Sequence, residues 1–296
     1  MKEELSILIP TYNDLCAPLV EQLFEQAVAV RGLRFEILVA DDGSTDAVVM
    51  EANRKINNLP NCRMLERGFN SGRATIRNFL AQQARYRWLL FIDSDMSVIG
   101  KQFVRRYLDD TEEQVVYGGY SVGKGDPSNL RYRYEKAAEP FHRAEQRQQQ
   151  PYRDFHTSNF MISRELMLTQ PFDERFRHYG YEDVFFGKTL KQHHVEILHI
   201  DNPLGFNTFE SNADFLRKTE EGTRTLHEFR EELRGYNRLL TLVGGIHLEA
   251  VRWVIRLLHR LFSPLERRNL EGRHPSLTVF KLYKLGYYLT LDNKNN

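Results

Sequence analysis

The sequence predicts an α/β fold, with a central, mostly parallel sheet, helices on both faces and a helical C-terminal extension. Short β-rich segments alternate with segments of helical periodicity through residues 5–92, which is typical of parallel sheets. The run Arg87–Ile92 is mostly large and apolar, as expected of a strand buried on both faces. Near the C-terminus only helical patterns remain. We therefore predict a sheet domain over residues 1–235 and an amphipathic, basic and aromatic tail over residues 236–296.

The alternation is clearest in the first third of the chain. Asp14 or a neighbour is expected to cap the first helix, because a side-chain oxygen there accepts bonds from unpaired amides, and Pro18 fits the first turn. Asn70-Ser-Gly72 is expected to turn into the third helix. The predicted strands are Leu5–Ile9, Phe35–Ala40, Cys62–Leu65 and Trp88–Ile92, and the predicted helices are Ala17–Val30, Ala47–Asn57 and Arg73–Gln83.

After Asp95 the alternation loosens. The segment Asn129–Gln150 is polar and rich in arginine, which favours a helix with a solvated face, although it could also line the acceptor side or cover a donor. The predicted strands of this part are Val115–Tyr120, Thr157–Ile162 and Val195–Ile200, and its further helices are Glu182–His193 and Ala213–Arg234.

The tail combines basic, aromatic and apolar residues. A helix over Ile246–Phe262 places Glu249, Arg252, Arg256 and Arg260 on one stripe and most apolar residues elsewhere, and Ser263-Pro264 is expected to end it. Leu277–Leu291 mixes tyrosines and leucines with lysines. Residues 245–296 hold nine Lys and Arg against four Asp and Glu. Two interpretations stay open: helices packed on their own domain, or peripheral contact with a membrane through 246–291.

Composition limits the function classes. The chain of 296 residues carries a formal net charge of +1, so no global charge points to nucleic acid. Two cysteines, Cys16 and Cys62, indicate a reducing compartment. Strand-like sequence from Leu5 leaves no room for a signal peptide, and no apolar run reaches spanning length. We expect a cytoplasmic protein. Any contact with the cell membrane is expected to be peripheral and on its inner face.

Acidic residues follow two of the predicted strands directly. Asp93-Ser94-Asp95 ends the strand Trp88–Ile92, at the sheet edge where open α/β sheets bind ligands. Two carboxylates at this spacing suit a hard divalent cation that carries a phosphate-bearing substrate. Asp41-Asp42 follows the strand Phe35–Ala40, and a carboxylate there can accept a hydrogen bond from a nucleobase imide. Helix capping accounts for the following Ser44-Thr45-Asp46 but not for this pair.

Five short motifs occur in one order and carry a family resemblance. They are Ile9-Pro-Thr-Tyr-Asn13, Asp41-Asp-Gly-Ser-Thr-Asp46, Asn70-x-Gly72 with Arg77-Asn78, Phe91-Ile-Asp-Ser-Asp95 and Tyr179-Gly-Tyr-Glu-Asp183. Together they resemble the family 2 glycosyltransferases of GT-A fold, over about two thirds of the chain. The resemblance implies a nucleoside-diphosphate sugar donor, a divalent metal (Mn²⁺ or Mg²⁺) and inversion at the anomeric carbon.

The resemblance also assigns roles to residues. It implies that Asp95 binds the metal and that Asp93, with Ser94 beside it, contacts ribose or donor sugar. An arginine on a helix is most often solvated, and only the motif assigns Arg77 to the donor. The other donor contacts that it implies are Pro10, Thr11 and Tyr12 beside base and ribose, Asp42 or Asp41 at a uracil-like base edge, and Asn70 and Gly72 near the base and diphosphate.

Glu182-Asp183 supplies the second half of the implied mechanism. Acids at a helix start can merely complement the helix dipole. The family uses the second acid as general base, so the resemblance implies Asp183 as the base and Glu182 as a contact to the acceptor or the donor sugar. Tyr181 departs from the family, in which a second glycine is common. His199 is either a further metal ligand or a half-buried structural histidine. His156 and Asn159 could contact sugar, although strand packing is favoured.

The sequence thus predicts an inverting, metal-dependent hexosyl- or N-acetylhexosaminyltransferase that uses a UDP-sugar and a glycan or lipid-linked glycan acceptor. Cell-surface polysaccharide or glycolipid synthesis is the expected setting. One alternative is a nucleotidyltransferase acting on sugar phosphates, but Pro10-Thr-Tyr-Asn13 stands where such an enzyme needs a glycine-rich phosphate loop. The other is a non-catalytic, membrane-associated partner that binds a nucleotide sugar.

Overall fold

The structure is a computed structural model that describes residues 1–109 and 112–292. These residues form two compact units. The first, here called the sheet unit, comprises Met1–Gly123, Pro140–Arg177 and Glu182–Thr208. The second, the helical unit, comprises Lys124–Glu139, His178–Tyr181 and the residues from Phe209 onward. The predicted domain boundary at residue 235 therefore falls inside the helical unit.

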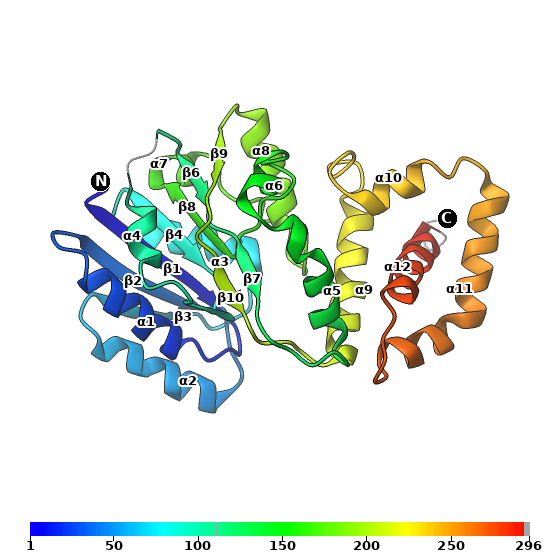
Figure 1. The fold of residues 1–296 in the computed structure, drawn as a ribbon, viewed down its shortest axis with the longest axis horizontal. Helices are drawn as coiled ribbons and strands as arrows, with labels where there is room; N and C mark the ends of the chain where they lie inside the picture. Colours follow the sequence, from blue (N-terminus) through cyan, green and yellow to red (C-terminus); the bar gives the residue numbers. More distant parts are fainter. Residues whose placement is uncertain (110–111, 293–296) are drawn as a thin grey trace. The chain divides into compact units, whose positions relative to one another are not determined.

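A seven-stranded sheet forms the centre of the sheet unit, in the order β3-β2-β1-β4-β8-β6-β9 (Figure 1). The pairs β3–β2, β2–β1, β1–β4 and β6–β9 are parallel, whereas β8 is antiparallel to both β4 and β6. The α/β class and the mostly parallel sheet are confirmed. The strands are β1 (Glu4–Thr11), β2 (Arg34–Asp41), β3 (Cys62–Glu66), β4 (Trp88–Ile92), β6 (Val115–Tyr117), β8 (Asn159–Ser163) and β9 (Ile197–His199).

Helices pack on both faces of this sheet. On one face, α3 (Arg73–Gln83), α7 (Arg164–Thr169) and α8 (Glu182–Gln192) bury apolar side chains against Leu8, Leu38 and other strand residues. On the other face α1 (Ala17–Val28) packs on β2, with Phe24 edge-on to Phe35 at 5.9 Å between ring centroids. The remaining helices of this unit are α2 (Ala47–Arg54), the 3-10 turn η1 (Lys55–Asn58), α4 (Phe103–Tyr107) and α6 (Ala144–Gln148).

Two local predictions in the sheet unit were wrong. The predicted strand Val115–Tyr120 is two strands, because the chain turns at Gly118-Gly119, where Gly119 has a φ of +81°. The second part, β7 (Tyr120–Val122), joins β10 (Leu204–Phe206) and β5 (Met96–Ser97) in a separate small sheet. Asp14 does not cap α1; the side-chain oxygen of Asn53 accepts the amides of Cys16 and Ala17 instead.

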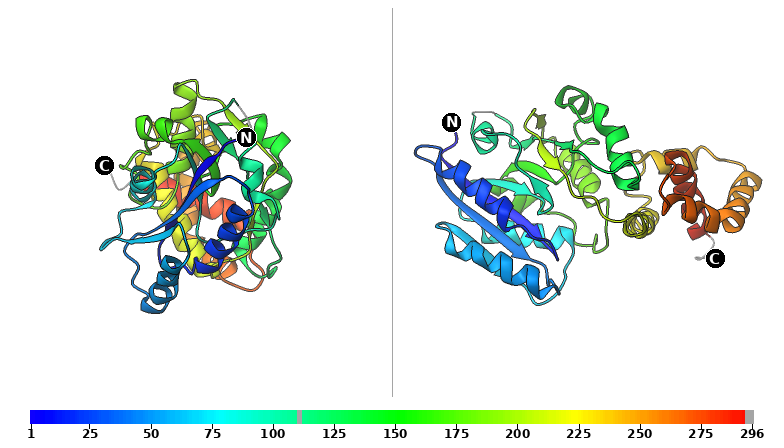
Figure 2. Two further views of the ribbon diagram at one scale, coloured as in Figure 1. Left: turned by 90° about the vertical axis from the view of Figure 1, so that its left-hand side faces the viewer. Right: turned by 60° about the horizontal axis from the view of Figure 1, so that its bottom comes forward.

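The helical unit contains α5 (Leu130–Ala138), α9 (Asn212–Glu228), α10 (Arg238–Gly244), α11 (Glu249–Leu270) and α12 (Leu277–Leu291). A 3-10 turn, η2 (Glu139–Phe141), follows α5. The apolar centre of this unit is formed from α5, α9, the end of α11 and α12, and includes Leu130, Phe215 and Phe280. The orange α11 and red α12 lie side by side (Figures 1 and 2).

The predicted helix end at Ser263-Pro264 was also wrong, because α11 continues through Pro264 to Leu270. Pro264 is exposed, so the carbonyl that loses its partner amide can be hydrated. The aromatic side chains of α12 that suggested an interfacial helix are largely internal, with Phe280, Tyr283 and Tyr288 all buried. In the described ranges 1–109 and 112–292, no helix combines the length and apolarity needed to cross a bilayer.

Candidate active site

The carboxyl ends of β1 and β2 meet because Thr11 pairs with Asp41 in the register of the two strands. Asp41 accepts the amides of Gly43 and Ser44 at 3.1 and 2.9 Å and thereby closes its own loop. Asp42 is 4% exposed and accepts the amides of Ser71 and Gly72 at 3.0 and 2.9 Å, with the Ser71 hydroxyl at 2.6 Å. Asp42 therefore ties the loop before α3 to the end of β2.

Gly72, directly before α3, is required by this geometry. Its φ is +89°, in the region that favours glycine, and an added Cβ would lie 2.8 Å from the carbonyl oxygen of Arg177. Asn70 is exposed, and its side-chain oxygen accepts the Gly72 amide at 3.1 Å. Both residues predicted on this loop thus lie together at the edge where β2 ends.

Asn13 makes a contact for which its motif gave no role. Its side-chain oxygen accepts the amides of Thr45 and Asp46 at 2.8 and 3.0 Å, and its own amide donates to the Ser44 hydroxyl at 2.7 Å. The φ of Asn13 is +52°, which asparagine tolerates better than most residues. The loop after β1 is thus clamped to the loop after β2.

The remaining donor-side residues lie at the ends of β1 and β4. Thr11 is buried, Pro10 and Ser94 are half-buried, and Tyr12 exposes 47% of its surface. The Asp42 amide donates to the Thr11 carbonyl at 2.9 Å. Tyr12 is thus the member of this group that presents an open aromatic side chain, to which a flat base could stack.

Arg77 links the end of β4 to the start of α8. Its guanidinium donates to Asp93 Oδ1 at 2.5 Å, and another nitrogen lies 3.7 Å from Glu182 Oε1. The side chain is 1% exposed, so the alternative of a solvated helix arginine does not hold, and the donor contact that the motif implies stays a prediction. Its Nε has no hydrogen-bond partner among the described residues. The buried guanidinium of Arg77 thus connects Asp93 with Glu182, which are more than eighty residues apart in the chain.

Glu182 and Asp183 begin α8 and experience different surroundings. Burial, and next the Asp183 charge, raise the pKa of Glu182 above its ordinary value. Burial also acts to raise the pKa of Asp183, but the hydrogen bond and charge of His156, together with the Val184 amide and the Arg77 charge, hold that pKa below its ordinary value. Asp183 Oδ2 lies 3.0 Å from His156 Nδ1, and its side chain is 21% exposed. Asp183 is therefore the ionised, accessible member of the pair, as a base must be.

His156 is the residue that sequence reasoning weighed wrongly, because strand packing seemed its better explanation. It precedes β8 rather than lying in it, and its side chain remains 39% exposed. Its ring is 6.3 Å from those of Tyr117 and Tyr120, between centroids. Ser158, two residues further on, accepts the Asp93 amide at 3.1 Å through its carbonyl, and nothing in the sequence indicates this long-range proximity.

Tyr181, which departs from the family pattern, has a φ of +72°. Gly180 before it has a φ of +99°. A non-glycine residue in this region costs about 1–2 kcal/mol, so the backbone at Tyr181 is strained. The strained backbone stands immediately before the Glu182–Asp183 pair, where such conformations are concentrated in proteins.

His199 occupies a buried, hydrogen-bonded position at the end of β9. Arg147 Nε donates to its Nδ1 at 3.2 Å, and its Nε2 lies 2.9 Å from the Pro151 carbonyl oxygen. Burial lowers the pKa of His199 to about 4, so the ring is neutral. Both nitrogens are engaged, and binding a metal would require His199 to give up one of these contacts. Arg147, from the segment expected to be solvated, is 4% exposed.

Asp95 is exposed in the turn after β4. In residues 1–109 and 112–292 no group of three or more His, Cys, Asp or Glu side chains is arranged to hold a metal ion. A single hard carboxylate nevertheless fits Mg²⁺ or Mn²⁺, because such ions commonly take one or two carboxylates and complete their shell with substrate phosphates and water. Asp95 fits a metal that arrives with a diphosphate, and it does not form a closed protein cage.

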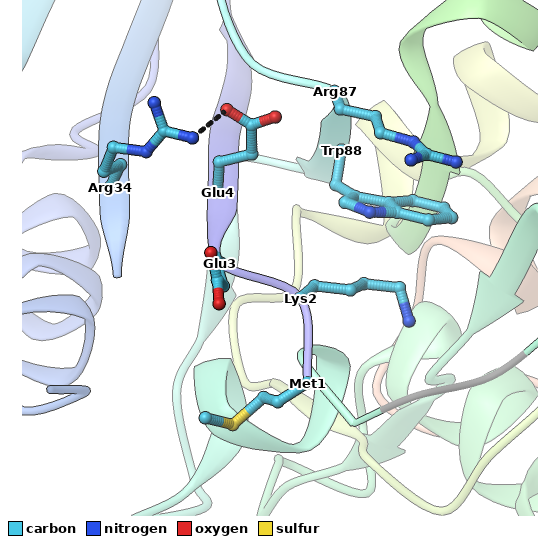
Figure 3. A pocket seen from close by; sticks show the side chains of 7 residues that line it. All are labelled: Met1, Lys2, Glu3, Glu4, Arg34, Arg87 and Trp88. Carbon is cyan, nitrogen blue, oxygen red and sulfur yellow. Dashed lines mark ion pairs between the residues drawn. The ribbon is translucent and has the colours of Figure 1, made fainter. Parts of the chain in front are cut away.

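A pocket of about 370 Å³ lies at the opposite end of the strands (Figure 3). It is lined by residues at the amino ends of β1, β2 and β4, including Lys2, Arg34 and Trp88. Lys2 Nζ stands 4.8 Å from the centroid of the Trp88 ring, and Arg34 pairs with Glu4 at 3.2 Å. None of the candidate site residues lines this pocket.

A parallel sheet that gathers these carboxylates at its carboxyl edge has the architecture of a GT-A glycosyltransferase. The profile described as glycosyl transferase family 2 matches residues 6–168, more than half of the chain. The chain belongs to this family. Among solved structures, S. aureus TarS 1–349 in complex with UDP covers 100% of this chain and 91% of its own, with a TM-score of 0.53 and 19% identity. The mannosyltransferase PcManGT from Pyrobaculum calidifontis, solved with GDP-Man and Mn²⁺, covers 100% and 87%, with a TM-score of 0.58 and 14% identity.

Curated relatives are similar over shorter stretches. The poly(ribitol-phosphate) beta-glucosyltransferase of Bacillus spizizenii is 32% identical over 113 residues, which are 37% of this chain and 17% of that protein. The uncharacterized glycosyltransferase YibD of Escherichia coli is 33% identical over 97 residues, 32% of this chain and 27% of that protein. The chain thus spans less than a third of the length of these relatives.

Proposed function

We propose that this glycosyltransferase transfers a hexosyl or N-acetylhexosaminyl group from a nucleoside-diphosphate sugar, with UDP as the first candidate, to a hydroxyl of a glycan or lipid-linked glycan. The observation that carries the proposal is the arrangement of Asp183: ionised, partly exposed, and linked through Glu182 and Arg77 to Asp93 at the end of β4. The complex of TarS with UDP and that of PcManGT with GDP-Man support a nucleotide-linked donor. The name of the matched Bacillus spizizenii protein, a poly(ribitol-phosphate) beta-glucosyltransferase, supports a polymeric acceptor.

In the proposed reaction, Asp183 accepts the proton of the acceptor hydroxyl as that oxygen attacks the anomeric carbon of the donor. The new C–O bond forms while the bond to the nucleoside diphosphate breaks, so a single displacement inverts the anomeric centre. In this proposal Asp42, Asn70 and Gly72 shape the loop beside the base, and Asp93 contacts ribose or sugar. A divalent cation, Mn²⁺ or Mg²⁺, bound at Asp95 would neutralise charge on the leaving diphosphate.

The donor is tested by incubating the protein with a panel of UDP-, GDP- and dTDP-sugars and Mn²⁺, with and without glycan acceptors. We expect release of a nucleoside diphosphate with one base class and an acceptor-dependent increase. The same panel in a thermal-shift assay should raise the melting temperature with the true donor, because a ligand that binds the folded state stabilises it. Stabilisation without release under any acceptor would instead favour the non-catalytic partner.

Asp95→Ala should abolish the metal-dependent part of donor binding, because the carboxylate that holds the cation against the diphosphate is lost. The measurement is donor affinity by calorimetry with Mn²⁺ and with EDTA. In the native protein EDTA should weaken binding; in the variant it should change nothing. A variant that binds donor as well as the native protein, and equally with or without EDTA, would remove Asp95 from the metal site.

His156→Ala should move the acid limb of the pH profile of kcat/KM to higher pH. His156 lowers the pKa of Asp183, and without it burial acts with less opposition to raise that pKa, so the base is protonated at a higher pH than in the native enzyme. His156→Gln, which retains a donor, should restore part of the shift. Superimposable acid limbs for the native enzyme and His156→Ala would contradict this role.

We further propose that the enzyme works at the inner face of the cell membrane, where lipid-linked acceptors are found. Support comes from the excess of cations in residues 245–296. Membrane contact was predicted for residues 246–291. We now assign it to α11 alone, because the aromatic residues of α12 are largely buried.

A further inference from the structure

The helix α11 exposes its apolar side and packs with its polar side. At 100° per residue, its apolar residues form one stripe opposite Arg252, Arg256 and His259. Arg256 and His259 are buried, whereas the stripe is open, with exposures up to 63% for Leu261 and 61% for Leu265. The stripe comprises Trp253, Val254, Leu258, Leu261, Phe262 and Leu265, all exposed. This is the reverse of an ordinary amphipathic helix on a globular domain.

Specific polar contacts hold α11 in this orientation. His259 Nδ1 lies 2.9 Å from Glu266 Oε2, and its ring is 5.1 Å from that of Tyr283 on α12, between centroids. Arg267 pairs with Glu220 of α9 and donates to the Tyr283 hydroxyl at 2.8 Å. A rotation that buried the apolar stripe would turn His259 and Arg267 outward and leave their partners, Glu220 and the Tyr283 hydroxyl, facing apolar side chains, which costs several kcal/mol. The exposed stripe is therefore a fixed property of the helical unit.

The close approach of α12 adds a steric reason. Gly286 of α12 faces the inward side of α11, and a Cβ there would lie 2.6 Å from His259. A glycine at this point lets α11 pack closely through a histidine instead of a leucine. The two helices are thus matched on the polar side of α11, and nothing on α12 takes up its apolar stripe.

Three cations are exposed on α11 and on α12, which packs beside it. Arg260 and Arg268 are exposed on α11, as is Lys281 on α12, and none of the three has an ion pair within the part of the chain that the structure describes. The acids of α11 are engaged: Glu249 pairs with Arg256, and Glu266 with His259. In a pair of copies joined through this stripe, the cations would face one another, since a twofold contact places the same patch on both sides. An anionic lipid surface complements them instead.

We infer that the outward side of α11 is a membrane-binding face, on which the six stripe residues enter the headgroup–acyl boundary of a bilayer while Arg260, Arg268 and Lys281 contact anionic lipid headgroups. This deepens the membrane setting proposed above. A tryptophan on the stripe suits the interface, where its ring is both apolar and a hydrogen-bond donor. The helix lies along the surface and does not cross it.

The test is co-sedimentation of the full chain with vesicles of phosphatidylcholine alone, or of phosphatidylcholine mixed with phosphatidylglycerol. We expect binding to the mixed vesicles that weakens as salt is raised and is far lower on phosphatidylcholine alone. Leu258→Gln and Leu261→Gln should each lower the partition coefficient about tenfold or more. Leu168→Gln, an exposed leucine of α7, is the matched control and should bind as the native chain does.

Because the substituted leucines are exposed, their variants should fold, which thermal unfolding verifies. Arg260→Glu with Arg268→Glu should remove the preference for phosphatidylglycerol. Vesicle binding that is equal in the native chain and the leucine variants would overturn the inference. So would a native dimer, seen by analytical ultracentrifugation, that becomes a monomer in Leu261→Gln and binds no vesicles. Vesicle binding requires neither a sugar donor nor turnover. The vesicle experiment can therefore be interpreted if the donor screen fails, and the donor screen can be interpreted if the chain binds no vesicles.

Discussion

Asp183→Asn is expected to lower kcat by about two to four orders of magnitude, in line with the loss of a general base. Asparagine keeps the size of the side chain and can still bond to His156, so the start of α8 should be unchanged. Donor affinity should also stay within error, because Asp183 is assigned to the nucleophile and Asp95 to the leaving group. Initial rates of nucleoside diphosphate release, with donor affinity from calorimetry, measure the two effects separately.

A matched control for this variant is Asp173→Asn. Asp173 is an acid of the same unit, and its partner, Arg175 at 2.7 Å, lies on the surface, so its loss should leave kcat almost unchanged. If Asp183→Asn turns over at a rate near that of Asp173→Asn, Asp183 is not the base. A loss of donor affinity equal to the loss of kcat would assign it to the donor site instead.

Arg77→Met is expected to lower the free energy of unfolding by about 3–5 kcal/mol at neutral pH, which for a chain of this size is a fall in Tm of roughly 10 °C. The methionine fills most of the space but leaves Asp93 and Glu182 without the buried cation that lies between them. The matched control is Arg85→Met. Arg85 also pairs with a buried acid, Glu36, but is itself 68% exposed, so a smaller loss is expected.

The effect of Arg77→Met should depend on pH. Arg77 acts to lower the pKa of Glu182, which burial raises, so the variant raises that pKa further. A carboxyl whose pKa is higher in the folded than in the unfolded state lowers the free energy of unfolding when the pH is above both pKa values. This penalty disappears when the pH falls below the unfolded-state pKa. The deficit of the variant should therefore be largest at neutral pH and shrink on acidification. Urea unfolding at several pH values measures this, and a deficit that is constant with pH would exclude an electrostatic origin.

The sequence predicted the first four strands and α3 closely because local patterns determine them. Each strand is an apolar run that ends in a turn signal, and the parallel register then brings Thr11, Asp41 and Glu66 to one edge. The break at Gly118-Gly119 was missed because the apolar pattern continues across it, and only the pairing of Tyr120 with Leu204 separates the strands. Asn53 was missed as a cap because it belongs to another helix.

The site residues were predicted by motif, and their mutual arrangement was not. Nothing local indicates that Arg77 is buried between Asp93 and Glu182, since the contact joins three distant segments. The bond from His156 to Asp183 is likewise long-range. The orientation of α11 depends on Glu220 and Tyr283 of other helices, which the periodicity of α11 does not contain. The periodicity located the stripe, and tertiary contacts decide which way it faces.

The position of β4 in the middle of the sheet also affects synthesis. β4 pairs with β1 on one side and β8 on the other, but β8 begins only at Asn159. At about 5–20 residues per second, the nascent chain presents β4 as an open edge for several seconds. Its residues Leu89–Ile92, fully buried in the finished sheet, are then the ones open to chaperones and to pairing with a neighbouring chain on the same polysome.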